Sequence, residues 1–284
     1  MKERLKRIVC GHFRPEELRQ YLLIKAVVFW GLILLCWFLF PVENQFSVMT
    51  HSFSYLGSFE PFYNPRWWWI FTAAMMVWGA GLVPPVLYVH HRFTHVSRWG
   101  AGLAASLLLL GCFGLVLVGV IPSVHEHFLG NQSWAGIHRD AGLLVAIAFC
   151  AGIFAHELLL FRDGFTAKRL GKRGYWRFFW PYLIWWTMVF TAGYFLVKWV
   201  FVYDEMKKAA VAAGRPLEGS WTEALHTWYS IPMWETILIC TLYLFLFWFV
   251  LVLPGEVSLP VKSGADASGD AVLTGTREHG NEQG

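Results

Sequence analysis

The chain has 284 residues, of which 56% are hydrophobic and only 15% are charged, and its formal net charge is +4. The apolar residues come in long runs rather than in amphipathic stripes, which is typical of a polytopic membrane protein. The small positive charge comes from basic loops that favour anionic lipid headgroups, and no segment resembles a nucleic-acid-binding module. We therefore expect membrane lipids, and no nucleic acid, as partners.

The first element is a basic arm, residues 1–21, followed by a transmembrane domain, residues 22–253. A helix needs ~20 apolar residues to cross a ~30 Å hydrocarbon layer, and it satisfies its own backbone polar groups in lipid. The first apolar run is full length and lacks a small-residue cleavage site, so it is predicted to stay as a span and not to be removed as a signal peptide. The chain is therefore predicted to be all-α, a six-helix transmembrane bundle with spans at about 22–41, 67–90, 99–122, 139–161, 179–202 and 230–253.

The basic residues predict that both termini lie in the cytoplasm. Six Lys and Arg residues lie in the arm and six more follow the fourth predicted span, whereas the three connections on the other side carry five together. Because cytoplasmic loops carry the excess of Lys and Arg, the connections after the first, third and fifth spans are predicted to face outwards. Residues 254–284 are rich in Gly, Ser and Asp and nearly free of aromatic residues, which predicts a disordered cytoplasmic tail.

The first outer connection is unusually polar for this chain and contains MTHSFSYLGSFEPFYNPRWWW, residues 49–69. Gly57 and Pro61 are turn formers, and the three tryptophans at its end fit an aromatic belt at the membrane interface. We expect an ordered loop that seats the second span at headgroup level. A second use of the loop, as one wall of a lipid-headgroup pocket with His51 and His138, is the alternative with a functional consequence.

Two features inside the predicted spans concern structure. Pro84 and Pro85 lie in the second span, where each removes a backbone donor, so a kink is expected there. Four of the five cysteines fall inside predicted spans, so no outer disulfide framework is expected.

Polar and ionisable side chains concentrate on the predicted outer side. An ionisable group at membrane depth costs ~2.5–3.5 kcal/mol or more unless it is paired or hydrated, so such groups are functional candidates. Asp140 lies in the first turn of the fourth span, where the helix N-terminus stabilises a carboxylate. Glu235, about one turn into the sixth span, has no such stabilisation. The outer candidates are His51, Ser52, Ser54, His125, Glu126, His127, His138, Asp140, His226 and Glu235.

One interpretation of this set is a catalytic metal site. Imidazole and carboxylate groups suit zinc, and three such ligands with a water molecule make a catalytic centre. The spacing does not define a site by itself, because His125 and His127 are two residues apart and no HExxH motif is present. The candidate zinc ligands are His51, His125, His127, His138, His226 and Glu235.

A second interpretation is a Ser-His-Asp hydrolase, with Ser54 or Ser52 as nucleophile, His138 as base and Asp140 as the residue that orients it. No G-x-S-x-G elbow accompanies these serines, which are also ordinary turn formers. A third interpretation is that the outer histidines only lie at the headgroup interface and form hydrogen bonds within their loops. The residues alone leave open whether the protein is an enzyme.

Two stretches resemble an uncharacterised prokaryotic family of six-helix membrane proteins. In FSVMTHSFSYLGSFEPFYNPRWWWIF, residues 46–71, the S-x-LG…NP pattern of that family is matched by Ser54, Leu56, Gly57, Asn64 and Pro65. In LVGVIPSVHEHFLGNQSWAGIHRDAGLLVAIAF, residues 117–149, its vG-x-(F/I)P…H pattern is matched by Gly119, Pro122 and His138. The family is in turn similar to the DRAM-like autophagy modulators and to proteins that act late in GPI-anchor maturation.

The resemblance implies six helices with both ends in the cytoplasm, and it implies the inner membrane of a prokaryote. It also implies an outer vestibule formed by the first and third loops above the second and fourth spans, but no particular reaction. A more distant analogy is to seven-helix hydrolases of the ceramidase type, which gather Ser, His and Asp at a membrane-embedded zinc ion. The pair of histidines that those proteins carry on a late helix is missing, and only His226 and Glu235 would replace it.

Three functions follow from these observations. The first is lipid binding or lipid processing in an outer-facing pocket built from the first and third loops, with His51, His138 and Asp140. The second is transport, against which the first, third and fifth spans show almost no mid-span charge and no clear inverted repeat. The third is a non-catalytic scaffold whose aromatic-rich fifth and sixth spans bind a partner protein.

Overall fold

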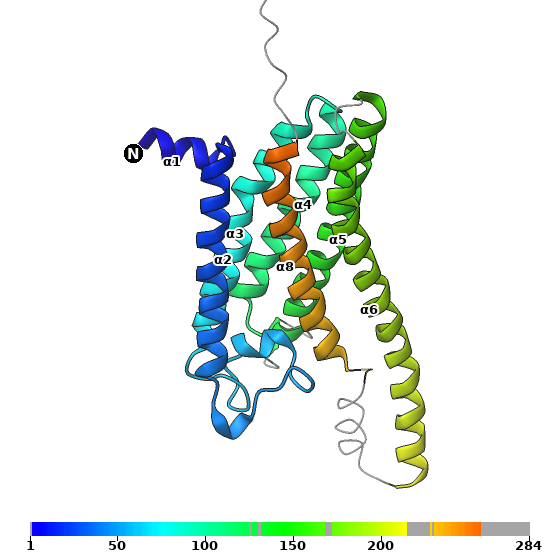
Figure 1. The fold of residues 1–284 in the computed structure, drawn as a ribbon. Coiled ribbons are helices and arrows are strands. Elements are labelled where there is room, and N and C mark those ends of the chain that lie inside the picture. Colours follow the sequence, from blue (N-terminus) through cyan, green and yellow to red (C-terminus); the bar gives the residue numbers. More distant parts are fainter. Residues whose placement is uncertain are drawn as a thin grey trace, which may run out of the picture.

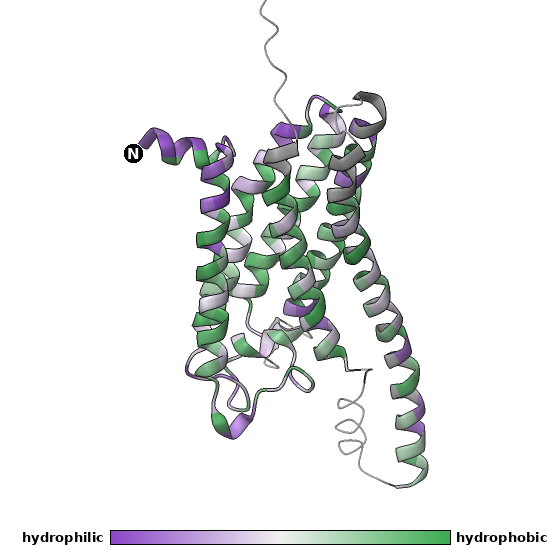
Figure 2. Ribbon diagram, viewed as in Figure 1, coloured by the Kyte–Doolittle hydropathy of each residue, from purple (hydrophilic) through white to green (hydrophobic). Residues whose placement is uncertain are grey.

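The computed structural model describes residues 2–124, 127–129, 132–167, 172–214, 228 and 230–256. Within these residues the only strands form one short hairpin, in which His127–Leu129 (β1) pairs with Gln132–Ser133 (β2). Among the described residues, five helices are long and apolar enough to cross a membrane, which confirms a helical, multi-pass membrane architecture (Figure 1, Figure 2). These spans are Pro15–Phe38 (α2), Trp68–Phe93 (α3), Arg98–Val120 (α4), Trp134–Asp163 within α5 (Trp134–Ala167), and Ile231–Val252 within α8 (Ile231–Glu256).

A further helix, Lys172–Ala212 (α6), contains the fifth predicted span but is 41 residues long. At 1.5 Å per residue it extends ~60 Å, about twice the thickness of the hydrocarbon layer. One end of α6 therefore continues beyond the rest of the bundle (Figure 1). The helix continues beyond the predicted end of the span at residue 202 because residues 204–212, DEMKKAAVA, are mostly good helix formers that do not need lipid around them.

The helices are arranged in a ring. α3 packs between α2 and α4, α4 packs against α5, and α8 packs against both α2 and α6. The ring closes where the Trp186 indole of α6 donates a 2.7 Å hydrogen bond to Glu157 Oε2 of α5. The helix Lys2–Val9 (α1) and the C-terminal end of α8 lie at one end of the bundle, here called the terminal end (Figure 1). The loop between α2 and α3 lies at the opposite end, called the loop end.

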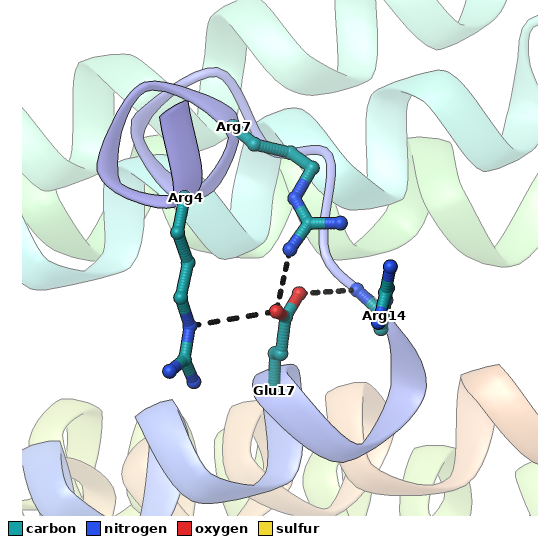
Figure 3. A network of polar contacts seen from close by, with 4 residues as sticks. All are labelled: Arg4, Arg7, Arg14 and Glu17. Atoms are coloured by element: carbon teal, nitrogen blue, oxygen red, sulfur yellow. Dashed lines mark hydrogen bonds and ion pairs between the residues drawn. The ribbon is translucent and has the colours of Figure 1, made fainter. Parts of the chain in front are cut away.

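A polar network joins α1 to α2 at the terminal end (Figure 3). Glu17 Oε1 accepts a 2.5 Å hydrogen bond from Arg7 Nη2 and lies 3.5 Å from Arg4 Nε, while its Oε2 accepts the Arg14 backbone N–H at 3.0 Å. Pro15 fits the first turn of a helix, where its missing N–H needs no partner, and a carboxylate stabilises the same turn. α2 therefore begins earlier than the predicted boundary at residue 22.

α3 continues as one helix through Pro84 and Pro85. Pro85 has no N–H for the carbonyl four residues before it, that of Gly81, and the Tyr21 hydroxyl of α2 donates to this carbonyl at 2.9 Å. The stem of Lys25 also lies against Gly81, where a side chain would come within 3.0 Å of it. Lys25 is buried, although it was not singled out from the sequence, and its Nζ lies 5.7 Å from the centre of an aromatic ring of α8, a cation–π distance.

The loop between α2 and α3 is ordered by Asn64, which is fully buried. Its Nδ2 donates to the Leu56 carbonyl at 2.9 Å, and its Oδ1 accepts a backbone N–H of the same loop at 3.2 Å. These bonds hold a short 3-10 helix, Phe53–Gly57 (η2), against the start of α3, where a side chain on Gly57 would overlap the Phe71 ring. Leu56, Gly57 and Asn64 thus hold η2 over the loop end of the bundle.

Candidate functional site

A cavity of about 610 Å³ lies between α3, α4, α5, α6 and α8, with η2 in its wall. Its volume is in the range of roughly 300–1,000 Å³ that is usual for small-molecule sites. Most of its wall is aromatic or aliphatic. The side chains in the wall that carry hydroxyl, imidazole or charged groups are Ser52, Ser54, Tyr55, Ser123, His138, Arg139 and Glu235, all near the loop end.

The apolar part of the wall reaches deep into the bundle. Its residues run from Ala135 to Cys150 on α5 and from Ile231 to Leu242 on α8. At 1.5 Å per residue, these stretches correspond to ~22 Å and ~16 Å along the two helix axes. These lengths are about three quarters and about half of the thickness of a ~30 Å hydrocarbon layer.

Glu235 reaches the cavity from the second turn of α8. Ser230 precedes this helix, and its Oγ accepts a backbone N–H of the first turn at 3.3 Å and donates to the Met49 carbonyl at 2.5 Å. This contact brings the first loop to α8, so that the Ser52 hydroxyl donates a hydrogen bond to Glu235 Oε2. Ser54 Oγ lies 3.2 Å from Ser52 Oγ. Two hydroxyl groups and a carboxylate thus form a polar cluster at the loop end of the cavity.

His138 is buried in the second turn of α5 and lies in the wall of the same cavity. Its Nδ1 is 2.6 Å from the Ile121 carbonyl, which can only accept, so Nδ1 carries the proton. In the neutral ring, Nε2 is then the nitrogen with an acceptor lone pair. The bond to Ile121 also fixes the ring relative to the end of α4.

Asp140 lies on the outer surface of α5. Its side chain is 69% exposed, and its Oδ1 is 3.3 Å from Arg139 Nη2. Because the His138 Nδ1–H is bonded to a backbone carbonyl, the structure does not place Ser54, His138 and Asp140 in the hydrogen-bonded order of a triad. Ser54 and His138 share the cavity wall without Asp140.

His51 lies in the first loop, beside the cavity and not among its lining residues. Its Nδ1 accepts the Ser47 backbone N–H at 3.4 Å and is 2.8 Å from Thr50 Oγ1. Its ring centre is 6.1 Å from those of Tyr55 and Tyr63. Burial lowers the pKa of His51 below its usual 6.5, so the neutral ring is favoured. These contacts are those of a histidine that orders its own loop.

The proposed zinc ligands are only partly described. His125 and His226 lie outside the described residues, as does the side chain of His127 in β1. In the part of the chain that the structure describes, no three His, Cys, Asp or Glu side chains come together in a group that could hold a metal ion. Zinc binding through this set stays a prediction.

Trp234 is a residue of the cavity wall that was not singled out from the sequence. Its indole N–H donates to the Trp228 carbonyl at 2.7 Å, and its ring is stacked on Phe195 of α6 at a centre distance of 4.6 Å. Because 18% of the residues are aromatic, an aromatic side chain does not by itself indicate a site. The one feature of the sequence that pointed to Trp234 was its position next to Glu235. Its ring is therefore held in place at the polar end of the cavity.

In chemical terms, the cavity offers a long apolar wall with a carboxylate, a tautomer-fixed imidazole and several hydroxyl groups at one end. Comparison of the chain with protein-family models, with curated proteins and with solved structures found no match. Its function is therefore inferred from this cavity.

Proposed function

We propose that this protein binds a lipid, or a lipid-like amphiphile, in the cavity at the loop end. The observation that carries the proposal is the distribution of polar groups in the wall: the hydroxyl, imidazole and charged groups lie near the loop end, while the deeper wall is mostly aromatic and aliphatic. A molecule with a polar head and an apolar tail matches this distribution. A uniformly polar solute would lose its hydrogen bonds against the deep wall, which costs free energy.

Two exposed residues in the wall support access from the membrane. Ala146 of α5 and Gly193 of α6 line the cavity and are exposed, so the cavity is not sealed on that side. Nearer the terminal end, the Trp186–Glu157 hydrogen bond joins the same two helices. The proposed path for an amphiphile therefore lies between the loop-end halves of α5 and α6.

The proposal includes a topology. We take α6 as a sixth span and place both termini in the cytoplasm of a prokaryotic inner membrane, as the resemblance to the six-helix family implies. In support, α1 and the end of α8 share the terminal end of the bundle (Figure 1). The basic residues of α1 lie at this end as well, in agreement with the positive-inside bias (Figure 2). The cavity then faces the outer leaflet.

The test compares two phenylalanine variants, Gly142→Phe and Gly102→Phe. Both glycines are interior residues of helices, and a Cβ atom added at either position would meet no described atom within 4 Å. Of the two, only Gly142 lines the cavity. We expect the purified wild type and Gly102→Phe to retain lipid in near-stoichiometric amounts, measured by mass spectrometry after extraction, and Gly142→Phe to lose most of it. Equal retention by the two variants, each monodisperse and with an unchanged unfolding temperature, would contradict the proposal.

A further inference from the structure

We propose that the cavity selects amphiphiles with a primary amine or another cationic headgroup, and that the Glu235 carboxylate is the counter-ion. This inference rests on the proposed function and specifies the headgroup. Inside a membrane, lipid tails are as apolar as the side chains of the wall, so a tail gains little by leaving the bilayer for the cavity. Discrimination between amphiphiles must therefore come from the polar end.

At the polar end of the cavity, the hydrogen-bond partner of Glu235 is a neutral side chain and not a cationic one. Its carboxylate accepts the Ser52 hydroxyl, and no ion pair joins it to a Lys, Arg or His among the residues that the structure describes. Arg139 shares the cavity wall but is paired with Asp140 at the outer surface. An ionised carboxylate offers ~four acceptor positions, so the bond from Ser52 leaves most of its capacity for a ligand.

The surrounding aromatic rings also favour a cation. Tyr55 and Trp234 line the cavity, and the negative face of an aromatic ring attracts an ammonium group. Both rings are held by further stacking, Trp234 on Phe195 and Tyr55 on Tyr63, the latter at a centre distance of 4.0 Å. A carboxylate with aromatic neighbours is a suitable environment for an amine. An anionic headgroup would be repelled by the same groups.

The experiment uses three single-chain probes that differ only in the headgroup: hexadecylamine, hexadecanol and hexadecanoate. Their binding to the purified full chain is measured by calorimetry in a neutral detergent, so that the micelle does not itself select a charge. We expect the amine to bind wild type about tenfold or more tightly than the alcohol, since hydrogen bonds to a charged group are the stronger ones. Hexadecanoate should bind most weakly.

Variants then assign the preference to one side chain. Glu235→Gln should bring the affinity for the amine to that for the alcohol, with the alcohol affinity changed less than about twofold. The matched control is Glu205→Gln, an exposed glutamate of α6 that should keep the full preference. If Glu235→Gln does not fold, Ser52→Ala gives a second test, because it frees the carboxylate and should keep or increase the preference for the amine.

The outcomes separate the two proposals. Equal affinity of the wild type for amine and alcohol, with both lost in Gly142→Phe, would overturn the headgroup inference and leave lipid binding in place. A preference for the amine that persists in Glu235→Gln would overturn the role of Glu235. Failure of all three probes to bind the wild type would overturn both proposals.

Discussion

Glycine has opposite roles in the packed part of the bundle, where helices are in contact, and in the hollow part, beside the cavity. Where α4 packs on α5, a side chain on Gly152 would come within 2.6 Å of Leu108. Beside the cavity, ten residues earlier on the same helix, a side chain on Gly142 would meet no described atom within 4 Å. A small residue in a membrane helix can therefore bring two helices together or leave room between them, and sequence spacing does not distinguish the two cases.

The largest effect is expected where glycine brings helices together. Gly152→Leu should lower the free energy of unfolding by about 3 kcal/mol, because the new side chain overlaps Leu108 and its backbone. Gly142→Leu, the matched change on the same helix, should alter it by less than about 0.5 kcal/mol. Denaturant unfolding in detergent measures both. Similar losses in the two variants would show that the two parts of α5 do not differ in packing.

The loop that covers the hollow part depends on one buried amide. Asn64→Ala should cost about 2 kcal/mol, because the Leu56 carbonyl loses its amide donor and keeps only the weak Cys36 thiol donor at 3.3 Å, while the Trp67 backbone N–H loses its acceptor. Asn44 also bonds two loop carbonyls, but it is only half-buried and water can replace its side chain. Asn44→Ala should therefore cost less than Asn64→Ala by the same unfolding measurement, and the reverse order would contradict the structure.

In the packed part, one hydroxyl compensates for a proline. Tyr21→Phe should cost about 1 kcal/mol, since it removes the donor to the Gly81 carbonyl that Pro85 leaves without a helical partner. Tyr194→Phe removes a hydroxyl from an exposed ring of α6 and should be neutral. Thermal unfolding of the two variants side by side tests the difference. An effect of Tyr21→Phe no larger than that of Tyr194→Phe would show that the carbonyl does not need the bond.

The smallest effect is a pH dependence of the covering loop. Because burial lowers the pKa of His51, the unfolded loop binds a proton more readily than the folded loop. The stability of the loop is therefore complete above the ordinary pKa of 6.5 and falls as the pH drops through that value towards the lower folded pKa. Hydrogen exchange of residues 46–58, corrected for intrinsic rates, should show more opening at about pH 5.5 than at about pH 7.5. His51→Gln should remove this difference, and its persistence would assign the pH dependence to another group.

Much of the fold could be predicted from the sequence, because a long apolar run has few alternatives to a spanning helix. The predicted span at 99–122 matches α4 closely. The ends of the helices were less predictable. Helices continue into the aqueous phase, where capping residues and helix propensity determine at which residue they end. Pro15 followed by Glu17 is a pattern typical of a helix start and indicates where α2 begins. Lys25, an ionisable residue within an apolar run, was also recognisable from the sequence as a candidate functional residue.

The candidate site was only partly predictable. Ser54, His138 and Glu235 were among the outer candidates and do line one cavity. The bond between Ser52 and Glu235 joins residues 183 positions apart, and no local pattern encodes such a pairing. Asp140 was assigned to orient His138 in a triad, but residues two positions apart on a helix lie on different faces, and Asp140 lies beside Arg139 at the surface.

The length of α6 has a mechanical consequence. The helix runs without interruption from Lys172 to Ala212, past Trp185 and Gly193 in the cavity wall, and its last turns extend beyond the bundle. A continuous helix behaves as a stiff rod over such a distance, so a displacement applied to its protruding end tilts the portion that borders the cavity. A force applied to the protruding end of α6 would therefore change the width of the cavity that α6 borders.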